Sequence, residues 1–229
     1  MRARIEYFLR LKKGSDCKEI SPKVVGLNDV TLSINPGDRV SVIGHNGAGK
    51  TTLLRAISGI YPATKGSISV EGHISSIIDI SFGFEDELSG IKNIELGLVF
   101  AGKTFSEAKE LAPIIAQEAL IGDAIYRPIY TYSTGMALRV AFALATYEQP
   151  EILVMDEILG AGDEAFRSIA QNKIDNLIEN SKICVLSTHD FGAVRKYTTK
   201  CLLMNKGSVQ FYGDVDEAID IYLSDVHKQ

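Results

Sequence analysis

The sequence predicts an α/β fold: a mostly parallel sheet with helices on both faces, some antiparallel strands, and an inserted helical subdomain. Three observations support this prediction. A glycine-rich turn at 44–49 follows an apolar, strand-like run and precedes an apolar-periodic, helix-like run. Beyond position 150, strand-like and helix-like segments alternate, which is typical of a parallel sheet covered by helices. A block at about 88–148 contains only helical patterns, so we expect it to form a separate helical subdomain.

The expected elements follow the chain in this order. Strands are predicted at 28–34 and 39–43, followed by the glycine-rich turn and its helix, and by strands at 67–71 and 74–78. Helical patterns then fill 90–101, 105–120 and 134–148. The last third alternates strands at 151–156, 182–188, 200–204 and 207–212 with helices at 163–179, 190–197 and 214–224.

Composition limits the class of protein. The 229 residues, 45% hydrophobic and 23% charged, are enough for one large or two small domains with a real core. The net charge of −5 argues against a protein that coats nucleic acid. No apolar run approaches the ~18 residues of a membrane span, and no secretory signal is present. Three cysteines without metal-ligand spacing, Cys17, Cys184 and Cys201, indicate structural thiols in a reducing compartment.

The first 22 residues differ from the rest and suggest a basic N-terminal segment before a main domain at 23–229. Basic residues alternate with apolar ones, a pattern that we interpret as a short amphipathic helix. Two interpretations stay open. The helix could contact an anionic membrane surface or a membrane partner, or it could be an ordinary solvated helix on the protein's own core. The basic residues are Arg2, Arg4, Arg10, Lys12 and Lys13.

The glycine-rich turn has the G-x-x-x-x-G-K-[ST] spacing of a phosphate-binding loop. Glycines let the backbone curl so that its N–H groups point at an anion, and the following helix adds its positive end. Lys50 would reach the β- and γ-phosphates, and the Thr51 hydroxyl would ligate Mg²⁺. We expect the His45 side chain to point away from the phosphates. The candidate nucleotide-binding residues are Gly44, His45, Asn46, Gly47, Ala48, Gly49, Lys50, Thr51 and Thr52. A chance glycine turn is the alternative, and the loop alone does not distinguish kinases, GTPases and motor ATPases.

Two later strands end in polar residues. The buried run before Asp156 and Glu157 would bring both carboxylates to the nucleotide edge of the sheet. Asp156 would hold Mg²⁺ through water, and Glu157 would polarise the attacking water as general base. His189 follows the next apolar strand, where it could bond the γ-phosphate and orient the water. A simple acidic turn and a structural histidine are the alternatives.

A Ser-x-Gly turn, Ser133-Thr134-Gly135, opens the helix that precedes the Asp156 strand. Such a turn at a helix N-terminus can bind a second anion, although it could also serve only as a helix cap. The order of phosphate loop, Ser-x-Gly helix, Asp-Glu strand and strand-end histidine resembles the nucleotide-binding subunit of ABC transporters. The resemblance covers about residues 24–225. Tyr132-Ser133-Thr134-Gly135-Met136 stands where the family usually has Leu-Ser-Gly-Gly-Gln.

The resemblance implies a head-to-tail homodimer. Each ATP would lie between the phosphate loop of one subunit and Ser133 and Gly135 of the other. Asp163 would end the loop that crosses the dimer, although this chain has Ile158 where many relatives have Pro.

Two further departures concern the nucleotide site. The family usually has a Gln where the core joins the helical subdomain, but residues 78–88 contain none. Asp79 and Ser81 are equal candidates to contact Mg²⁺ or the water instead. We also expect the family's first strand to be missing, and the adenine-stacking aromatic stays unassigned, Tyr7 and Phe8 being the nearest upstream aromatics.

The Tyr132 turn, the Gly160–Asp163 run and the 82–90 segment resemble the bacterial polysaccharide exporters, which move O-antigen, capsule or teichoic-acid chains across the inner membrane. The implied cargo is a lipid-linked glycan. The implied partner is a separate multi-span permease in two copies, which would hold the ATPase at the cytoplasmic face of the inner membrane, with no nucleic-acid partner. Some members carry a carbohydrate-binding domain after the ATPase. Because this sequence stops at Gln229, we expect it to have none.

Three other functions stay in view. The chain could serve an ABC transporter with another cargo, or it could be a soluble ABC-type ATPase that acts on DNA or ribosomes. Those soluble proteins carry a long coiled-coil insert or two ATPase modules, whereas this chain has one phosphate loop and 106 positions from Lys50 to Asp156. A small-molecule kinase is the third alternative, and it would not need the Ser-x-Gly turn.

Overall fold

The computed structural model describes residues 4–8, 25–78, 83–156 and 164–226. These residues form two compact units. The first unit comprises the described residues of Met1–Ile78, Pro150–Ile158 and Asn180–Gln229, and the second those of Asp79–Gln149 and Leu159–Glu179. Each unit has a hydrophobic core of its own.

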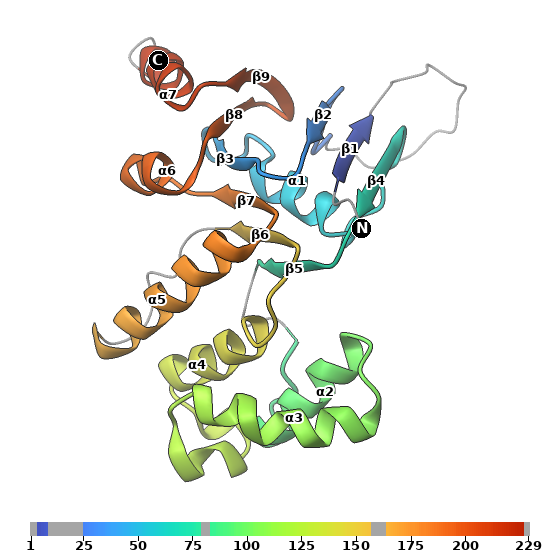
Figure 1. Cartoon of the computed structure of the whole chain (residues 1–229), viewed down its shortest axis with the longest axis vertical. Coiled ribbons are helices and arrows are strands. Elements are labelled where there is room, and N and C mark those ends of the chain that lie inside the picture. Colours follow the sequence, from blue (N-terminus) through green and yellow to red (C-terminus); the bar gives the residue numbers. More distant parts are fainter. Residues whose placement is uncertain (1–3, 9–24, 79–82, 157–163, 227–229) are drawn as a thin grey trace, which may run out of the picture. The chain divides into compact units, whose positions relative to one another are not determined.

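The first unit contains a six-stranded sheet and a three-stranded sheet (Figure 1). The larger sheet has the order β5-β6-β7-β3-β8-β9, parallel except for the antiparallel pair β8–β9. The smaller sheet is antiparallel, in the order β2-β1-β4. The strands are β1 (Arg4–Phe8), β2 (Thr31–Ile34), β3 (Arg39–Ile43), β4 (Ser67–Glu71), β5 (Ile74–Ile77), β6 (Ile152–Asp156), β7 (Ile183–Ser187), β8 (Lys200–Asn205) and β9 (Ser208–Gly213), and the helices are α1 (Lys50–Ile57), α6 (Phe191–Tyr197) and α7 (Val215–Val226).

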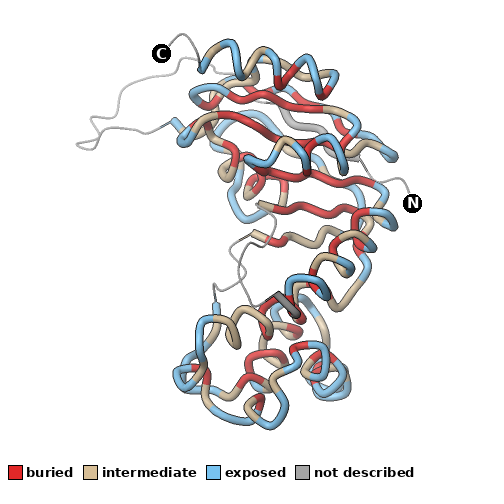
Figure 2. The backbone as a smooth tube through the Cα atoms, turned by 90° about the vertical axis from the view of Figure 1, so that its left-hand side faces the viewer, coloured by how far each residue is buried: buried red, intermediate tan, exposed pale blue. Residues whose placement is uncertain are grey.

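Helices cover both faces of the larger sheet. Strand β8 shows this directly, because its side chains alternate between two cores. Leu202 and Met204 pack with α1 residues, whereas Cys201 and Leu203 pack with α6 and α7. Strand β7 is buried along its whole length, as parallel strands between two helical layers usually are. Figure 2 shows this burial concentrated in the strands. The predicted α/β fold with a mostly parallel sheet is confirmed.

The prediction of an N-terminal helix is wrong for residues 4–8, which form β1. This strand pairs with β2 and β4, with Glu6 opposite both Ser33 and Ser69, at a place where we expected the first strand to be missing. Polar and apolar residues alternate from Arg4 to Tyr7, which is the period of a strand, and isoleucine and aromatic residues favour strands. The remainder of the predicted basic segment lies outside the described residues.

The second unit is helical in its described residues. Its core joins α2, α3 and α4 and includes Ile94, Leu98, Ile115 and Val140. A capping box formed by Thr104 and Glu107 begins α3. Its elements are α2 (Gly90–Phe100), α3 (Phe105–Glu118), the 3-10 turns η1 (Gly122–Tyr126) and η2 (Ile129–Thr131), α4 (Thr134–Ala145) and most of α5 (Glu164–Asn180). The helices predicted at 90–101, 105–120 and 134–148 all lie in this unit.

For each helix and strand whose range was predicted from the sequence, the predicted and observed ends differ by at most three positions. Strand β2 begins at Thr31 rather than 28, because Asp29 adopts a left-handed backbone (φ 52°) that a strand cannot contain. Helix α4 ends before Thr146, whose hydroxyl donates to the Phe142 carbonyl oxygen at 2.8 Å. None of the helices in the described ranges is long and apolar enough to cross a membrane.

Candidate functional site

The glycine-rich loop leaves β3 at Ile43 and enters α1 at Lys50, as the sequence predicts. Gly44, Gly47 and Gly49 have φ values of 149°, 79° and 103°, which favour glycine. A Cβ on Gly44 would lie 2.4 Å from the Met204 carbonyl oxygen, and one on Gly49 would lie 2.8 Å from that of Gly26. The loop therefore needs Gly44 and Gly49 both for backbone conformation and for close packing, and Gly47 for backbone conformation.

A distant hairpin turn holds the loop from outside. The turn between β8 and β9 contains Lys206 and Gly207, both with positive φ. The Gly207 N–H donates to the Ala48 carbonyl oxygen at 2.8 Å, and the Asn28 N–H donates to the Gly207 carbonyl oxygen at 2.7 Å. The curl of the loop is thus fixed by residues more than 150 positions later in the chain.

Positive charge is concentrated at the loop. The Lys50 side chain is buried, and its Nζ donates to the carbonyl oxygens of Gly44 (2.7 Å) and His45 (3.2 Å). Helix α1 has no acidic residue in its first turn, and no side chain in the described part of the chain caps it. A glycine loop of this kind, the N-terminus of a helix and an ammonium group together favour an anion at this place.

Thr51 and Asp156 meet beside the loop. The Thr51 hydroxyl donates to Asp156 Oδ2 at 2.6 Å, joining the first turn of α1 to the end of β6. Asp156 is half-buried and lies opposite Ser187 of β7, so it stands at the carboxyl edge of the parallel sheet. The hydroxyl and the carboxylate are hard oxygen donors of the kind that Mg²⁺ prefers. Glu157, the predicted general base, lies outside the described residues.

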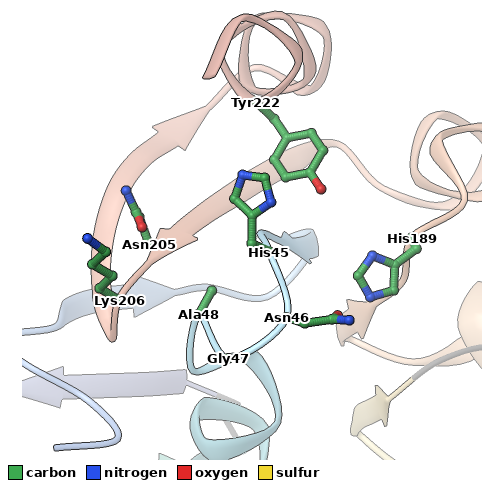
Figure 3. A pocket seen from close by; sticks show the side chains of 8 residues that line it. All are labelled: His45, Asn46, Gly47, Ala48, His189, Asn205, Lys206 and Tyr222. Carbon is green, nitrogen blue, oxygen red and sulfur yellow. The ribbon is translucent and has the colours of Figure 1, made fainter. Parts of the chain in front are cut away.

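A cavity of about 530 Å³ opens on the outer side of the loop (Figure 3). The His45 ring points toward α7 and lies on Tyr222, with 4.9 Å between ring centroids. Asn46 and the exposed His189, which follows β7, lie side by side at another part of the cavity. The remaining predicted loop residue, Thr52, follows Thr51 in α1. The cavity is lined by His45, Asn46, Gly47, Ala48, His189, Asn205, Lys206 and Tyr222.

The Ser-x-Gly turn lies in the second unit. Ser133 is exposed and caps α4, its Oγ accepting a hydrogen bond from the Met136 N–H at 3.2 Å. Among the described residues, a Cβ added to Gly135 would meet Ser133 Oγ alone, at an ordinary 3.9 Å. The fold of this unit therefore does not itself require glycine at position 135.

Tyr132, the residue before this turn, is anchored by a hydrogen bond. Its hydroxyl donates to the Ala124 carbonyl oxygen at 2.7 Å. Burial raises the pKa of the Tyr132 phenol above its ordinary value, in keeping with its role as a hydrogen-bond donor. Asp163 and the alternative candidates Asp79 and Ser81 lie outside the described residues.

Sequence reasoning missed three parts of the site. Tyr222 contacts the loop from the last helix, the Lys206–Gly207 turn braces it, and Gly26 packs against Gly49. Asn205-Lys206-Gly207 is recognisable in the sequence as a hairpin turn. Its position on the loop depends on the sheet order β3-β8-β9, which no local pattern shows.

Comparison with known proteins places this geometry in context. The model of the ABC transporter family matches residues 27–160. The O-antigen export system ATP-binding protein RfbE of Yersinia enterocolitica is 38% identical over 198 residues, which are 86% of this chain and 81% of RfbE. The teichoic acids export ATP-binding protein TagH of Bacillus anthracis is 37% identical over 86% of this chain, and RfbB of Myxococcus xanthus, an O-antigen export system ATP-binding protein, is 35% identical over 93%. The chain covers only 36% of TagH and 49% of RfbB.

Solved structures share the fold at low sequence identity. A dimeric ATP-binding cassette in a post-hydrolysis state with ADP and Pi superposes with a TM-score of 0.71 at 22% identity, covering 92% of this chain and 98% of that one. An ATP-binding subunit of an ABC transporter gives a TM-score of 0.72 at 21% identity, covering 94% and 91%.

Proposed function

Because the chain belongs to the ABC transporter family, we propose that it is the ATP-hydrolysing subunit of an exporter of lipid-linked, O-antigen-like polysaccharide. One structural observation carries the ATPase part. Thr51 and Asp156, 105 positions apart in sequence, meet beside a glycine loop that is shaped for phosphate. The export part is supported by RfbE, RfbB and TagH, whose names describe O-antigen or teichoic-acid export.

ATP binds with its phosphates in the curl of the loop from Gly44 to Thr52. The backbone N–H groups of the loop and the first turn of α1 solvate the negative oxygens. Lys50 exchanges the carbonyl oxygens of Gly44 and His45 for the β- and γ-phosphate oxygens, which neutralises charge that the loop amides alone leave uncompensated.

The Thr51 hydroxyl would hold Mg²⁺ directly, and Asp156 would hold it through water. The hydrogen bond of 2.6 Å between the two side chains supports this assignment, because it places both oxygen donors at the same point beside the loop. Mg²⁺ usually takes few protein ligands and completes its shell with water and phosphate oxygens. When bound, the ion neutralises charge on the phosphates.

Hydrolysis uses Glu157 as general base and His189 as a hydrogen-bonding partner of the γ-phosphate. The position of Asp156 at the end of β6 supports the role of Glu157, because Glu157 is the next residue in the sequence. His189 follows β7, the neighbouring parallel strand, and its side chain is exposed on the cavity beside the loop.

The chain works as a homodimer in which each ATP is shared. Ser133 and Gly135 of one copy contact the nucleotide held by the other copy, and Asp163 ends the crossing loop. The exposed Ser133 and the absence of an intramolecular need for glycine at 135 support a role for this turn outside its own unit. Closure of the dimer then requires ATP, and hydrolysis releases it.

Two copies of a multi-span permease hold this dimer at the cytoplasmic face of the inner membrane. The permease moves the lipid-linked glycan, and the ATPase supplies the energy. Recovery of the chain with a permease encoded beside it, from membranes of the source cell, would support this arrangement.

Phosphate release from ATP without any acceptor tests the proposed activity. The purified chain should release phosphate with Mg²⁺ present, and Lys50→Ala should lose ATP binding and release. Lys92→Ala is the control, because Lys92 is an exposed lysine of α2 that pairs with Glu95. Phosphate transfer only to an added small molecule would contradict the proposal and favour a kinase.

A further inference from the structure

The phosphate loop has an aromatic contact on its outer side. His45 lies against Tyr222 of α7, with 4.9 Å between ring centroids and 35° between ring planes (Figure 3). His45 Nε2 is buried and has no hydrogen-bond partner among the described residues. Packing against Tyr222 therefore contributes strongly to fixing the direction of this side chain, and with it the second residue of the loop.

Tyr222 also contacts the segment that follows β7. Its ring meets Phe191 edge to face, with 5.8 Å between centroids and 72° between planes. Phe191 is the first residue of α6 and lies two positions after His189. Asp190 caps α6 by accepting the Gly192 N–H at 2.7 Å, so the residues from His189 to Phe191 form one short, ordered turn. One side chain thus touches both the phosphate loop and the turn that carries His189.

The helix that carries Tyr222 is fixed by other contacts. Arg195 of α6 pairs with Asp216 of α7 at 2.8 Å, and Gln210 of β9 donates to Asp225 Oδ2 at 2.6 Å. Ala218 and Ile219 of α7 are buried in the core with β8. Because these contacts hold the helix at both ends and in the middle, Tyr222 has a fixed base from which to position the two loops.

We infer that Tyr222 is a positioning residue for ATP hydrolysis, holding His45 of the phosphate loop and the His189 turn in one arrangement. The inference rests on the proposed ATPase function. Aromatic pairs of this kind stabilise an arrangement enough that loss of both should lower kcat/KM for ATP by about tenfold. We expect the contact with His45 to affect ATP affinity, because His45 belongs to the phosphate loop. We expect the contact with Phe191 to affect kcat, because Phe191 adjoins His189, the proposed partner of the γ-phosphate.

The test compares Tyr222→Leu, which keeps an apolar side chain without the ring, with Tyr222→Phe, which keeps the ring. ATP affinity and the rate of phosphate release are measured on the full chain with Mg²⁺. We expect Tyr222→Leu to lower both, and Tyr222→Phe to restore them. Leu223→Ala is the control on the same helix, because Leu223 is 40% exposed and lies outside the site.

Double variants separate positioning from a general effect on folding. If Tyr222 acts through His45, adding Tyr222→Leu to His45→Ala should cause little further loss of ATP affinity. Adding it to Phe191→Leu should likewise cause little further loss of kcat. A side chain that only stabilises the fold would lower the melting temperature and leave these losses additive. If Tyr222→Leu does not fold, the single variants His45→Ala and Phe191→Leu test the same two contacts.

Two results would overturn the inference. One is wild-type affinity and kcat in folded Tyr222→Leu, and the other is additive losses in both double variants. Failure of the proposed function looks different, because the unmodified chain would then neither bind ATP nor release phosphate.

Discussion

Replacing Thr51 by valine tests the proposed magnesium site with a change of almost no volume. The variant loses the hydroxyl that donates to Asp156 Oδ2 at 2.6 Å and keeps the branched shape of the side chain. In the metal-bound site this oxygen would contact the ion itself, an interaction that we take as comparable to a hydrogen bond to a charged group, about 1.5–3 kcal/mol. Because about 1.4 kcal/mol corresponds to a factor of ten, loss of this oxygen should weaken Mg·ATP binding by about 10- to 100-fold.

The assay measures ATP affinity by fluorescence of a labelled nucleotide, once with Mg²⁺ and once with EDTA. We expect Thr51→Val to lose the gain in affinity that Mg²⁺ gives and to keep the affinity measured in EDTA. An equal loss in both conditions would refute the reasoning, because the hydroxyl would then shape the loop rather than ligate the metal. Full Mg²⁺-dependent affinity would refute it as well.

Thr146→Val provides a matched control in the second unit. The Thr146 hydroxyl is buried and donates to the Phe142 carbonyl oxygen at 2.8 Å, so the same substitution again removes one hydrogen bond. We expect a loss of about 1 kcal/mol in stability, or a melting temperature lower by about 2–4 °C, with unchanged ATP affinity.

The remaining predictions concern backbone and burial. Gly49→Ala should lower the melting temperature and abolish ATP binding, because its φ of 103° and a Cβ 2.8 Å from the Gly26 carbonyl oxygen add strain of about 1–3 kcal/mol. Gly135→Ala should keep the wild-type melting temperature, and a marked drop in thermal unfolding would show that the turn needs glycine internally. Burial raises the pKa of Cys184 to about 12 and that of Cys201 to about 11. Both should therefore resist a thiol reagent at pH 8 until the chain unfolds, as peptide mapping by mass spectrometry would show.

Local sequence patterns predicted most helices and strands of this fold well, because these elements are determined largely by neighbouring residues. The strand before Asp156 is a run of four buried apolar residues, and the loop glycines are spaced by the backbone geometry of anion binding. The prediction failed at the N-terminus, where residues 4–8 form a strand rather than a helix. Basic residues around Ile5 and Tyr7 suggested a helix, but β1 is completed by β2 and β4, which lie more than 20 and 55 positions away. Pairing between distant strands overrode the local charge pattern.

The residues of the site also divide into those that the sequence predicts and those that it does not. Thr51 and Asp156 could be paired from sequence, because the loop and the strand end are both expected at the carboxyl edge of a parallel sheet. Tyr222 could not be predicted, since one tyrosine among apolar residues in a helix is equally typical of a core position. Its contact with His45 depends on where α7 packs over β8, which is decided by the whole sheet.

The central claim is that two copies of the chain together complete each ATP site. Nucleotide-dependent dimerisation of the Glu157→Gln variant tests it most directly. Without the general base, ATP should bind and stay intact. Light scattering after gel filtration should therefore find a dimer with ATP and Mg²⁺ and a monomer with ADP. Adding Ser133→Arg should abolish the dimer and keep ATP binding. Thr104→Arg, which removes another exposed helix cap, should leave the dimer intact. A Glu157→Gln chain that stays monomeric at saturating ATP, or that dimerises normally with Ser133→Arg, would contradict the account.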